Sequence, residues 1–273
     1  MFENYFQAKD VRLYYVKTTL EDSPILLLHG GISRWEAFET IIPELEKHGC
    51  VYALDLRGHG KSDKDIGKYC LNDYVEDVVQ FIKEIISEPP VIFGHSLGGM
   101  IGIQIAAYYP ELVKGLIIGE SPINLEVLRE SSKSLAKWKR FSGNYLAFKD
   151  ENRIGEDKIK QGKEENALME FMIKSVMLTD SDVLTAMIDQ FEHTFMNYDI
   201  EILLQMIKCP VLLLQGNPDL QGIISDEDAK LALRLIPNAK HIKLKNAGHT
   251  LHIEDKKATL DAIIPFVKEL LEQ

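Results

Sequence analysis

The clearest structural signal in the chain is Val91-Ile92-Phe93-Gly94-His95-Ser96-Leu97-Gly98-Gly99. Three apolar residues, typical of a short buried strand, run directly into Gly-x-Ser-x-Gly, and an apolar helical pattern over Leu97–Tyr109 follows. A serine on a sharp turn between strand and helix has a strained backbone, and the glycines on either side leave room for it. The turn lifts the hydroxyl above the sheet edge, where the helix start favours negative charge. This context predicts a nucleophile at Ser96, whereas the pentapeptide alone is compatible with a plain tight turn.

Short apolar runs alternate with helical patterns along most of the chain. We expect buried strands at Ile25–Leu28, Val51–Leu54, Val91–Phe93, Leu116–Ile118, Val211–Leu214 and His241–Leu244, and an amphipathic edge strand at Val11–Val16. We expect helices at Ser33–His48, Leu71–Ile86, Leu97–Tyr109, Asp226–Leu235 and Lys256–Leu271. The buried runs lack strict alternation, as strands do when both sheet faces are covered. The order predicts an α/β fold, with a mostly parallel sheet and helices on both faces.

The alternation stops between residues 122 and 208, where the pattern is helical only. Apolar residues recur there at helical spacing, for example at Val183, Met187 and Phe191. An all-helical insertion in a parallel sheet is expected at the carboxyl edge, where open α/β sheets bind ligands. We therefore expect a core formed by residues 1–121 and 209–273, with residues 122–208 inserted as a helical cap, or lid. An extra helical layer without a role in the site is the alternative.

A serine nucleophile needs a base, and the base needs an acid to orient it. At a turn of this kind the three follow the chain order serine, acid, histidine. His249 stands in a loop after the last expected strand, which opens at the same sheet edge as Ser96. It is the predicted base, with His252 as the alternative. The spacing of these two histidines also suits a metal, but no further ligand cluster accompanies them, so we expect no metal site.

Asp219 is the predicted acid, because it is the first acidic residue after the penultimate expected strand. Glu120 is the rival, since it ends the strand after the nucleophile helix and reaches the same sheet edge. Asp226 lies further along, where Ser225 or Asp226 is typical of a helix N-cap.

His29-Gly30-Gly31 closes the first buried strand. A glycine turn there presents a backbone N–H opposite the serine, and the amides of Gly31 and Leu97 together form a candidate oxyanion hole. Trp35 and Phe38 follow this turn and are candidates for lining the substrate pocket. Core packing explains these two side chains equally well.

Four motifs along nearly the whole chain resemble the α/β-hydrolase superfamily, in its serine-nucleophile, esterase-like branch with a helical cap. The motifs are His29-Gly30-Gly31, Asp55-Leu56-Arg57-Gly58-His59-Gly60-Lys61-Ser62, Gly94-His95-Ser96-Leu97-Gly98-Gly99 and Asn246-Ala247-Gly248-His249. The resemblance implies a catalytic triad of Ser96, Asp219 and His249, oxyanion amides at Gly31 and Leu97, and a substrate pocket shaped by residues 122–208. It implies a structural role for the loop that holds Arg57 and His59. The acid loop departs from the family, because Leu220-Gln221-Gly222 replaces the commoner proline-rich continuation.

The composition narrows the setting in which the chain works. Its formal net charge of -11 implies an acidic surface that repels phosphate backbones, so we expect no nucleic-acid partner. Three scattered cysteines suit a reducing compartment. The N-terminus lacks a signal-peptide pattern, and the apolar runs are too short to cross a bilayer. We expect a soluble cytoplasmic protein without a membrane partner and, since no dinucleotide motif follows the first strand, without a cofactor. The oligomeric state stays open.

These features predict a serine hydrolase that cleaves a carboxylic ester or related acyl bond of a small, mainly apolar molecule. A thioesterase, a carbon–carbon bond hydrolase and a perhydrolase use the same triad and remain alternatives. A ligand-binding signalling module with slow turnover is the alternative from another class. In the family that the chain resembles, the dehalogenase and epoxide hydrolase branches use an aspartate as nucleophile. A serine at position 96 argues against both branches.

Overall fold

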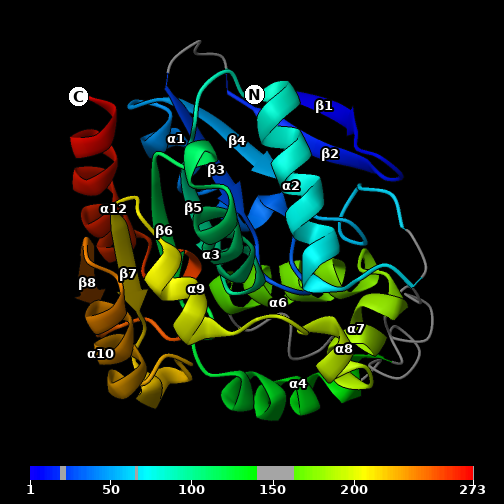
Figure 1. Cartoon of the computed structure of the whole chain (residues 1–273). Helices are drawn as coiled ribbons and strands as arrows, with labels where there is room; N and C mark the ends of the chain where they lie inside the picture. Colours follow the sequence, from blue (N-terminus) through cyan, green and yellow to red (C-terminus); the bar gives the residue numbers. More distant parts are fainter. Residues whose placement is uncertain (19–22, 65–66, 140–162, 273) are drawn as a thin grey trace.

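The computed structural model describes residues 1–18, 23–64, 67–139 and 163–272. Its centre is an eight-stranded sheet in the order β1-β2-β4-β3-β5-β6-β7-β8 (Figure 1). The strands are β1 (Phe2–Gln7), β2 (Arg12–Lys17), β3 (Pro24–Leu28), β4 (Cys50–Leu54), β5 (Val91–His95), β6 (Gly115–Gly119), β7 (Val211–Gln215) and β8 (Ala239–Lys243). Pairs β1–β2 and β2–β4 are antiparallel, and all the other pairs are parallel. The prediction of a mostly parallel α/β sheet is confirmed.

Helices cover both faces of the sheet. Successive residues of each strand point to opposite sides, so a continuous apolar run makes both faces apolar, and each must be buried. In β3, Leu26 and Leu28 pack in one apolar cluster, with α2 (Leu71–Ile85), α3 (Leu97–Tyr108), α9 (Ile200–Met206) and α10 (Asp226–Leu235). Ile25 and Leu27 pack in the other, with the 3-10 helix η1 (Trp35–Phe38), α1 (Ile42–Leu45), α11 (Leu251–Glu254) and α12 (Lys256–Leu271). Two further 3-10 turns are η2 (Pro110–Leu112) and η3 (Pro218–Leu220). The five strands β3 to β7 are wholly buried, which explains their continuous apolar runs.

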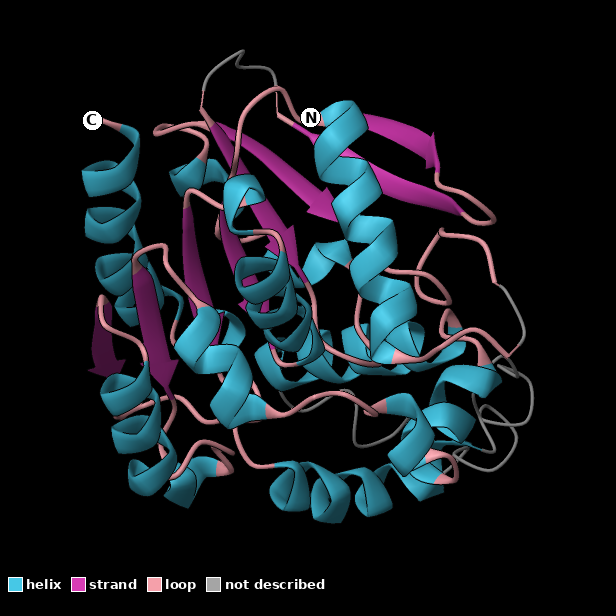
Figure 2. Ribbon diagram, viewed as in Figure 1, coloured by secondary structure: helices cyan, strands magenta, loops and turns pink. Residues whose placement is uncertain are grey.

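A helical segment lies between β6 and β7, as the sequence predicts. It contains α4 (Leu125–Lys139), α6 (Lys163–Met177), α7 (Ser181–Ile188) and α8 (Phe191–Thr194), followed by α9. Figure 2 shows α4, α6, α7 and α8 gathered beyond the arrowheads of the parallel strands, at the carboxyl edge of the sheet. Helix α9 instead packs against α3 and α10 on a face of the sheet. The segment therefore places four of its helices where open sheets of this class bind ligands.

Three local expectations are wrong. One helix was expected over Ser33–His48, but η1 and α1 form instead, because the Trp35 N–H donates to the Asp55 carboxylate and Pro43 begins a new turn. Strand β1 was not expected; it pairs with β2 at the open edge, where little burial is needed. The last strand begins at Ala239, two residues before the expected start, because its half-exposed edge position hides the apolar pattern.

Candidate active site

Ser96 lies on a sharp turn between β5 and α3. Its backbone has φ 51° and ψ -116°, a conformation that residues other than glycine rarely adopt. The Ser96 N–H donates to the Gly119 carbonyl at 3.0 Å, which fixes the turn to β6. A Cβ at Gly94 would lie 2.3 Å from the Gly98 carbonyl oxygen, and one at Gly98 would lie 2.1 Å from that of Leu28. Both glycines are therefore required by close backbone packing, and a strained serine held in this way indicates a functional site.

We predict that Gly98→Ala lowers the free energy of unfolding by about 3 kcal/mol, because its Cβ would overlap the rigid backbone of β3. Gly67→Ala is the control: unlike Gly98, Gly67 has a positive φ of 84°, but no described atom lies within 4 Å of its Cβ position. Only the backbone strain of about 1–2 kcal/mol is expected there. Urea unfolding of both variants tests the prediction, and equal losses would contradict it.

The loop of His249 is held over this turn by two side chains that the sequence did not single out for the purpose. His95, next to the serine, forms a hydrogen bond from Nε2 to the His249 carbonyl at 2.8 Å. The centroids of the two imidazole rings lie 4.9 Å apart. Glu254, in α11, accepts the N–H of Gly248 at 2.6 Å and that of Thr250 at 2.8 Å. The His249 loop is thus tied to the Ser96 turn on one side and to α11 on the other.

Glu120 lies against His249. Its Oε2 is 3.6 Å from His249 Nδ1, and its side chain is fully buried at the end of β6. The same carboxylate accepts the N–H of Gly216 at Oε1 and the N–H of Ile223 at Oε2, both at 2.6 Å. Among the described residues, His249 Nδ1 is buried and has no hydrogen-bond partner. Glu120 is therefore positioned to receive that N–H once the contact tightens by a few tenths of an ångström.

Asp219 does not take this position. It lies exposed in the turn η3, and its backbone N–H donates to Asn217 Oδ1 at 3.0 Å. Among the described residues its carboxylate forms no ion pair and accepts no hydrogen bond. Asp226 is engaged elsewhere, because its Oδ1 accepts Gln215 Nε2 and Lys243 Nζ. The geometry thus gives no support to Asp219 as the acid and favours the rival, Glu120.

The glycine turn after β3 runs close to the nucleophile. A Cβ at Gly30 would lie 3.1 Å from the Cβ of Ser96, and one at Gly31 would lie 3.2 Å from Met187 of α7. Leu97 is the first residue of α3, so its N–H has no intrahelical partner. The two backbone segments predicted to form the oxyanion hole therefore meet beside Ser96.

Two buried histidines hold this turn. His59 Nε2 accepts the N–H of Ile32, so its Nδ1 carries the proton and donates to the Arg57 carbonyl at 2.8 Å. By the same reasoning, His29 accepts from Leu56 at Nε2 and donates from Nδ1 to the Gly30 carbonyl at 2.7 Å. Both rings must be neutral for this pattern, and burial lowers the pKa of His59 to about 4 and that of His29 well below its ordinary value.

The loop from Asp55 to Ser62 has the structural role that the resemblance implies. Arg57 is buried and forms a two-pronged ion pair with Asp77 of α2, at 2.6 and 2.7 Å. The buried Asp55 accepts the N–H groups of Trp35 and Lys61, while burial raises its pKa to about 7.

Trp35 and Phe38 require a correction. Both side chains are buried in the apolar cluster on the sheet face that α12 covers. Phe38 is fully enclosed, and its ring lies 5.5 Å from that of Phe93 and 4.7 Å from that of His252. Core packing therefore accounts for these residues, and His252 is stacked in the core rather than placed as the base.

Acid should weaken the fold through these histidines. The folded pKa of His59, about 4, lies below its ordinary value of 6.5, so its stabilising effect is present above pH 6.5 and is lost as the pH falls toward 4. Between about pH 7.5 and pH 5 this one group should cost about 2 kcal/mol of unfolding free energy. We expect His59→Asn to remove that share of the pH dependence, whereas His48→Asn, at a partly exposed site, should retain it. Urea unfolding at the two pH values measures both, and parallel profiles for wild type and His59→Asn would contradict the assignment.

Residues 23–256 match the family described as alpha/beta hydrolase fold. The chain belongs to this α/β-hydrolase family. It is accordingly an enzyme of the hydrolase class, and the resemblance of the four motifs to the α/β-hydrolase superfamily is confirmed.

Relatives of this α/β-hydrolase are named for different activities. It is 26% identical over 267 residues to a protein of Haemophilus influenzae named "Putative esterase/lipase", covering 94% of this chain and 88% of that protein. It is 33% identical over 122 residues to epoxide hydrolase 1 of Caenorhabditis elegans, covering 43% of this chain and 30% of that protein. An esterase structure from Exiguobacterium antarcticum superimposes with a TM-score of 0.77 at 19% identity, covering 98% of this chain and 100% of that one. The last likeness establishes the fold.

Two cavities of this α/β-hydrolase lie away from Ser96, Glu120 and His249. One, of about 650 Å³, is lined by residues of the segments 123–125 and 198–205 together with Asp228 and Leu231. The other, of about 230 Å³, separates the loop before α2 from α7 and α8.

In the described part of the chain, no cluster of three His, Cys, Asp or Glu side chains suits a metal ion, and no helix is long and apolar enough to span a bilayer.

Proposed function

We propose that this α/β-hydrolase cleaves a carboxylic ester or related acyl bond of a small, mainly apolar molecule, through an acyl-enzyme on Ser96. The observation that carries the proposal is the strained Ser96 turn, together with a histidine whose Nδ1 faces a buried carboxylate. A nucleophile, a base and an orienting acid at one sheet edge form the set that acyl transfer requires.

The proposed reaction has two halves. His249 takes the Ser96 proton as the hydroxyl oxygen attacks the carbonyl carbon, and Glu120 stabilises the imidazolium that forms. The amides of Gly31 and Leu97 receive the negative oxygen of the tetrahedral intermediate. The alcohol leaves with the proton from His249; water then attacks the acyl-enzyme by the same route and releases the acid.

We further propose that the helices of residues 122–208 act as a cap that shapes the substrate pocket. Met187 supports this role, because its side chain covers Gly31, the predicted oxyanion residue. We also propose a cytoplasmic location, which the three scattered cysteines support.

Turnover and labelling test the proposed function. The protein should hydrolyse p-nitrophenyl acetate or butyrate over many cycles, and a fluorophosphonate should modify Ser96, as mass spectrometry of the peptides will show. Stoichiometric binding of ligand without turnover would favour the signalling module. Epoxide opening without labelling of Ser96 would favour the mechanism of the epoxide hydrolase relatives.

A further inference from the structure

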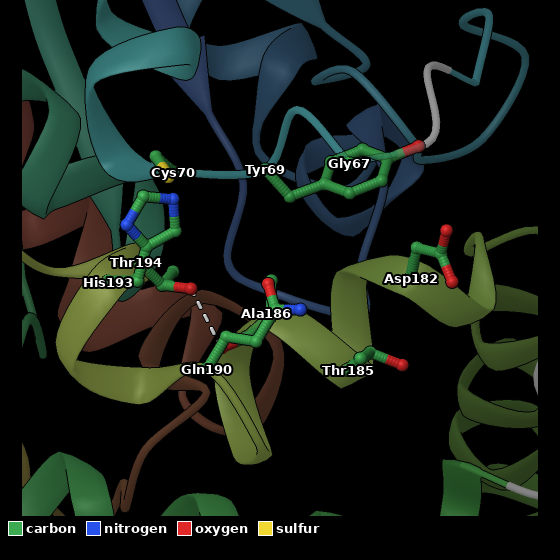
Figure 3. A pocket seen from close by; sticks show the side chains of 9 residues that line it. All are labelled: Gly67, Tyr69, Cys70, Asp182, Thr185, Ala186, Gln190, His193 and Thr194. Atoms are coloured by element: carbon green, nitrogen blue, oxygen red, sulfur yellow. Dashed lines mark hydrogen bonds between the residues drawn. The ribbon is translucent and has the colours of Figure 1, made fainter.

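The cavity of about 230 Å³ lies between the two parts of the chain that the insertion brings together. The core loop before α2 forms one wall, and α7 and α8 form the other (Figure 3). Its lining residues are Gly67, Tyr69, Cys70, Asp182, Thr185, Ala186, Gln190, His193 and Thr194. Because one water molecule takes about 30 Å³ in the liquid, the cavity has room for a ligand the size of about eight water molecules.

The walls of this cavity present hydrogen-bond acceptors and a negative charge. The hydroxyls of Tyr69, Thr185 and Thr194 already donate their hydrogens, to Asp180 Oδ2 at 2.9 Å, to the Ser181 carbonyl at 3.2 Å and to the Ala186 carbonyl at 2.7 Å. The oxygens of Thr185 and Thr194 keep lone pairs that can accept a hydrogen bond. Among the described residues the Asp182 carboxylate has no ion-pair partner, and none of the lining residues is Lys or Arg.

The Asp182 carboxylate favours a cation over an anion in this cavity, and the Gln190 amide and His193 ring add hydrogen-bond donors for polar groups of the same ligand. An ammonium group supplies up to three donors and a positive charge for the Asp182 carboxylate. An aromatic or aliphatic body fits beside the Tyr69 ring and Ala186, and an aromatic face also attracts cations. Figure 3 shows Asp182, Thr185 and Gln190 on the insertion side of the cavity and Tyr69 on the core side, so one ligand spans both.

Helix α7 connects this cavity to the proposed catalytic centre. Asp182, Thr185 and Ala186 line the cavity, whereas the next residue, Met187, covers Gly31. The helix is also fastened to the Arg57–Ser62 loop, because the Asp180 N–H donates to the Gly58 carbonyl at 2.8 Å. A ligand that joins Asp182 to the core loop would therefore restrain α7 and the position of Met187.

We propose that this cavity is a second binding site, for a small organic ammonium ion, whose occupation restrains α7 and changes substrate binding at Ser96. The binding site stands on its own geometry, while its link to catalysis rests on the proposed function. The link requires that the ammonium ion change the KM of ester hydrolysis, since the two sites share α7.

The binding experiment uses benzylammonium and the neutral, near-isosteric benzyl alcohol as probes, titrated calorimetrically into the full chain. Wild type should bind benzylammonium at least tenfold more tightly than benzyl alcohol, and Asp182→Asn should abolish this preference. Asp189→Asn is the matched control, because Asp189 lies at the end of the same helix but does not line the cavity. Failure to bind benzylammonium, or equal binding by wild type and Asp182→Asn, would overturn the site.

Two further measurements separate this site from the catalytic one. Protein whose Ser96 has been blocked with a fluorophosphonate should still bind benzylammonium, and loss of binding would show that the probe occupies the catalytic pocket. Benzylammonium should change the KM of wild type for p-nitrophenyl butyrate at least twofold but leave Asp182→Asn unaffected. An unchanged KM would reject the link through α7. If Ser96 resists labelling, the proposed function fails, while the titration still decides the binding site.

Discussion

Ser96→Ala should lower the turnover of p-nitrophenyl esters by about 10⁶-fold, the loss seen when the serine of a triad is removed. The hydroxyl is the only group on the strained turn that forms the covalent bond in the proposed mechanism. The fold should survive, because an alanine methyl occupies the space of the serine Cβ with the same φ of 51°. Steady-state kinetics with a fluorophosphonate labelling assay measures the effect.

Ser87→Ala is the matched control, since Ser87 is exposed after α2 and lies outside the site. It should retain wild-type turnover and labelling. If a correctly folded Ser96→Ala protein keeps its esterase activity, Ser96 is not the nucleophile and the acyl-enzyme mechanism is wrong.

Glu120→Gln should lower kcat by about 10³–10⁴-fold with little change in KM. A neutral amide neither fixes the tautomer of His249 nor stabilises the imidazolium in the transition state. Asp219→Asn should cost less than about tenfold, because the exposed Asp219 carboxylate has no contact with the base. Steady-state kinetics of the two variants gives the comparison.

Glu120 also accepts the N–H groups of Gly216 and Ile223, so its replacement affects the loop as well as the base. Urea unfolding and a pH–rate profile separate the two roles. A purely structural residue would lower stability and leave the pH dependence of kcat unchanged, whereas loss of the orienting carboxylate should also move its midpoint to lower pH. If instead Asp219→Asn shows the larger loss of kcat, the acid is Asp219. If neither variant loses activity, His249 is not the base.

The sequence alone was sufficient for the fold class. The strands β3 to β7 are buried on both faces, so each appears as a short apolar run whatever its neighbours are. The helices α10 and α12 were predicted with their observed bounds, because each begins after a capping residue, Ser225 or Asp255. The turn at Ser96 was predictable for a similar reason, since glycines at fixed spacing are needed wherever backbones pass closely.

Tertiary structure alone brought Glu120 to His249. Asp219 and Glu120 both follow strands that end at the same sheet edge, so chain order did not separate them. Their loops differ: Glu120 turns inward with φ 45° and accepts two backbone N–H groups, while η3 leaves Asp219 facing solvent. The same limit applies to Phe38, whose aromatic ring suits a pocket or a core equally until its neighbours are known.

Local pattern therefore determined the buried strands, the main helices and the Ser96 turn, because backbone geometry and burial impose those residue types on short segments. The contact between Glu120 and His249, the neutral histidines that hold the glycine turn after β3 and the cavity beside α7 were decided only by tertiary structure. Each depends on distances between segments far apart in the chain: Glu120 with His249, His59 with Ile32, and Tyr69 with Asp180. Such distances result from how the packed layers and loops settle against one another, and no periodicity within a single segment encodes them.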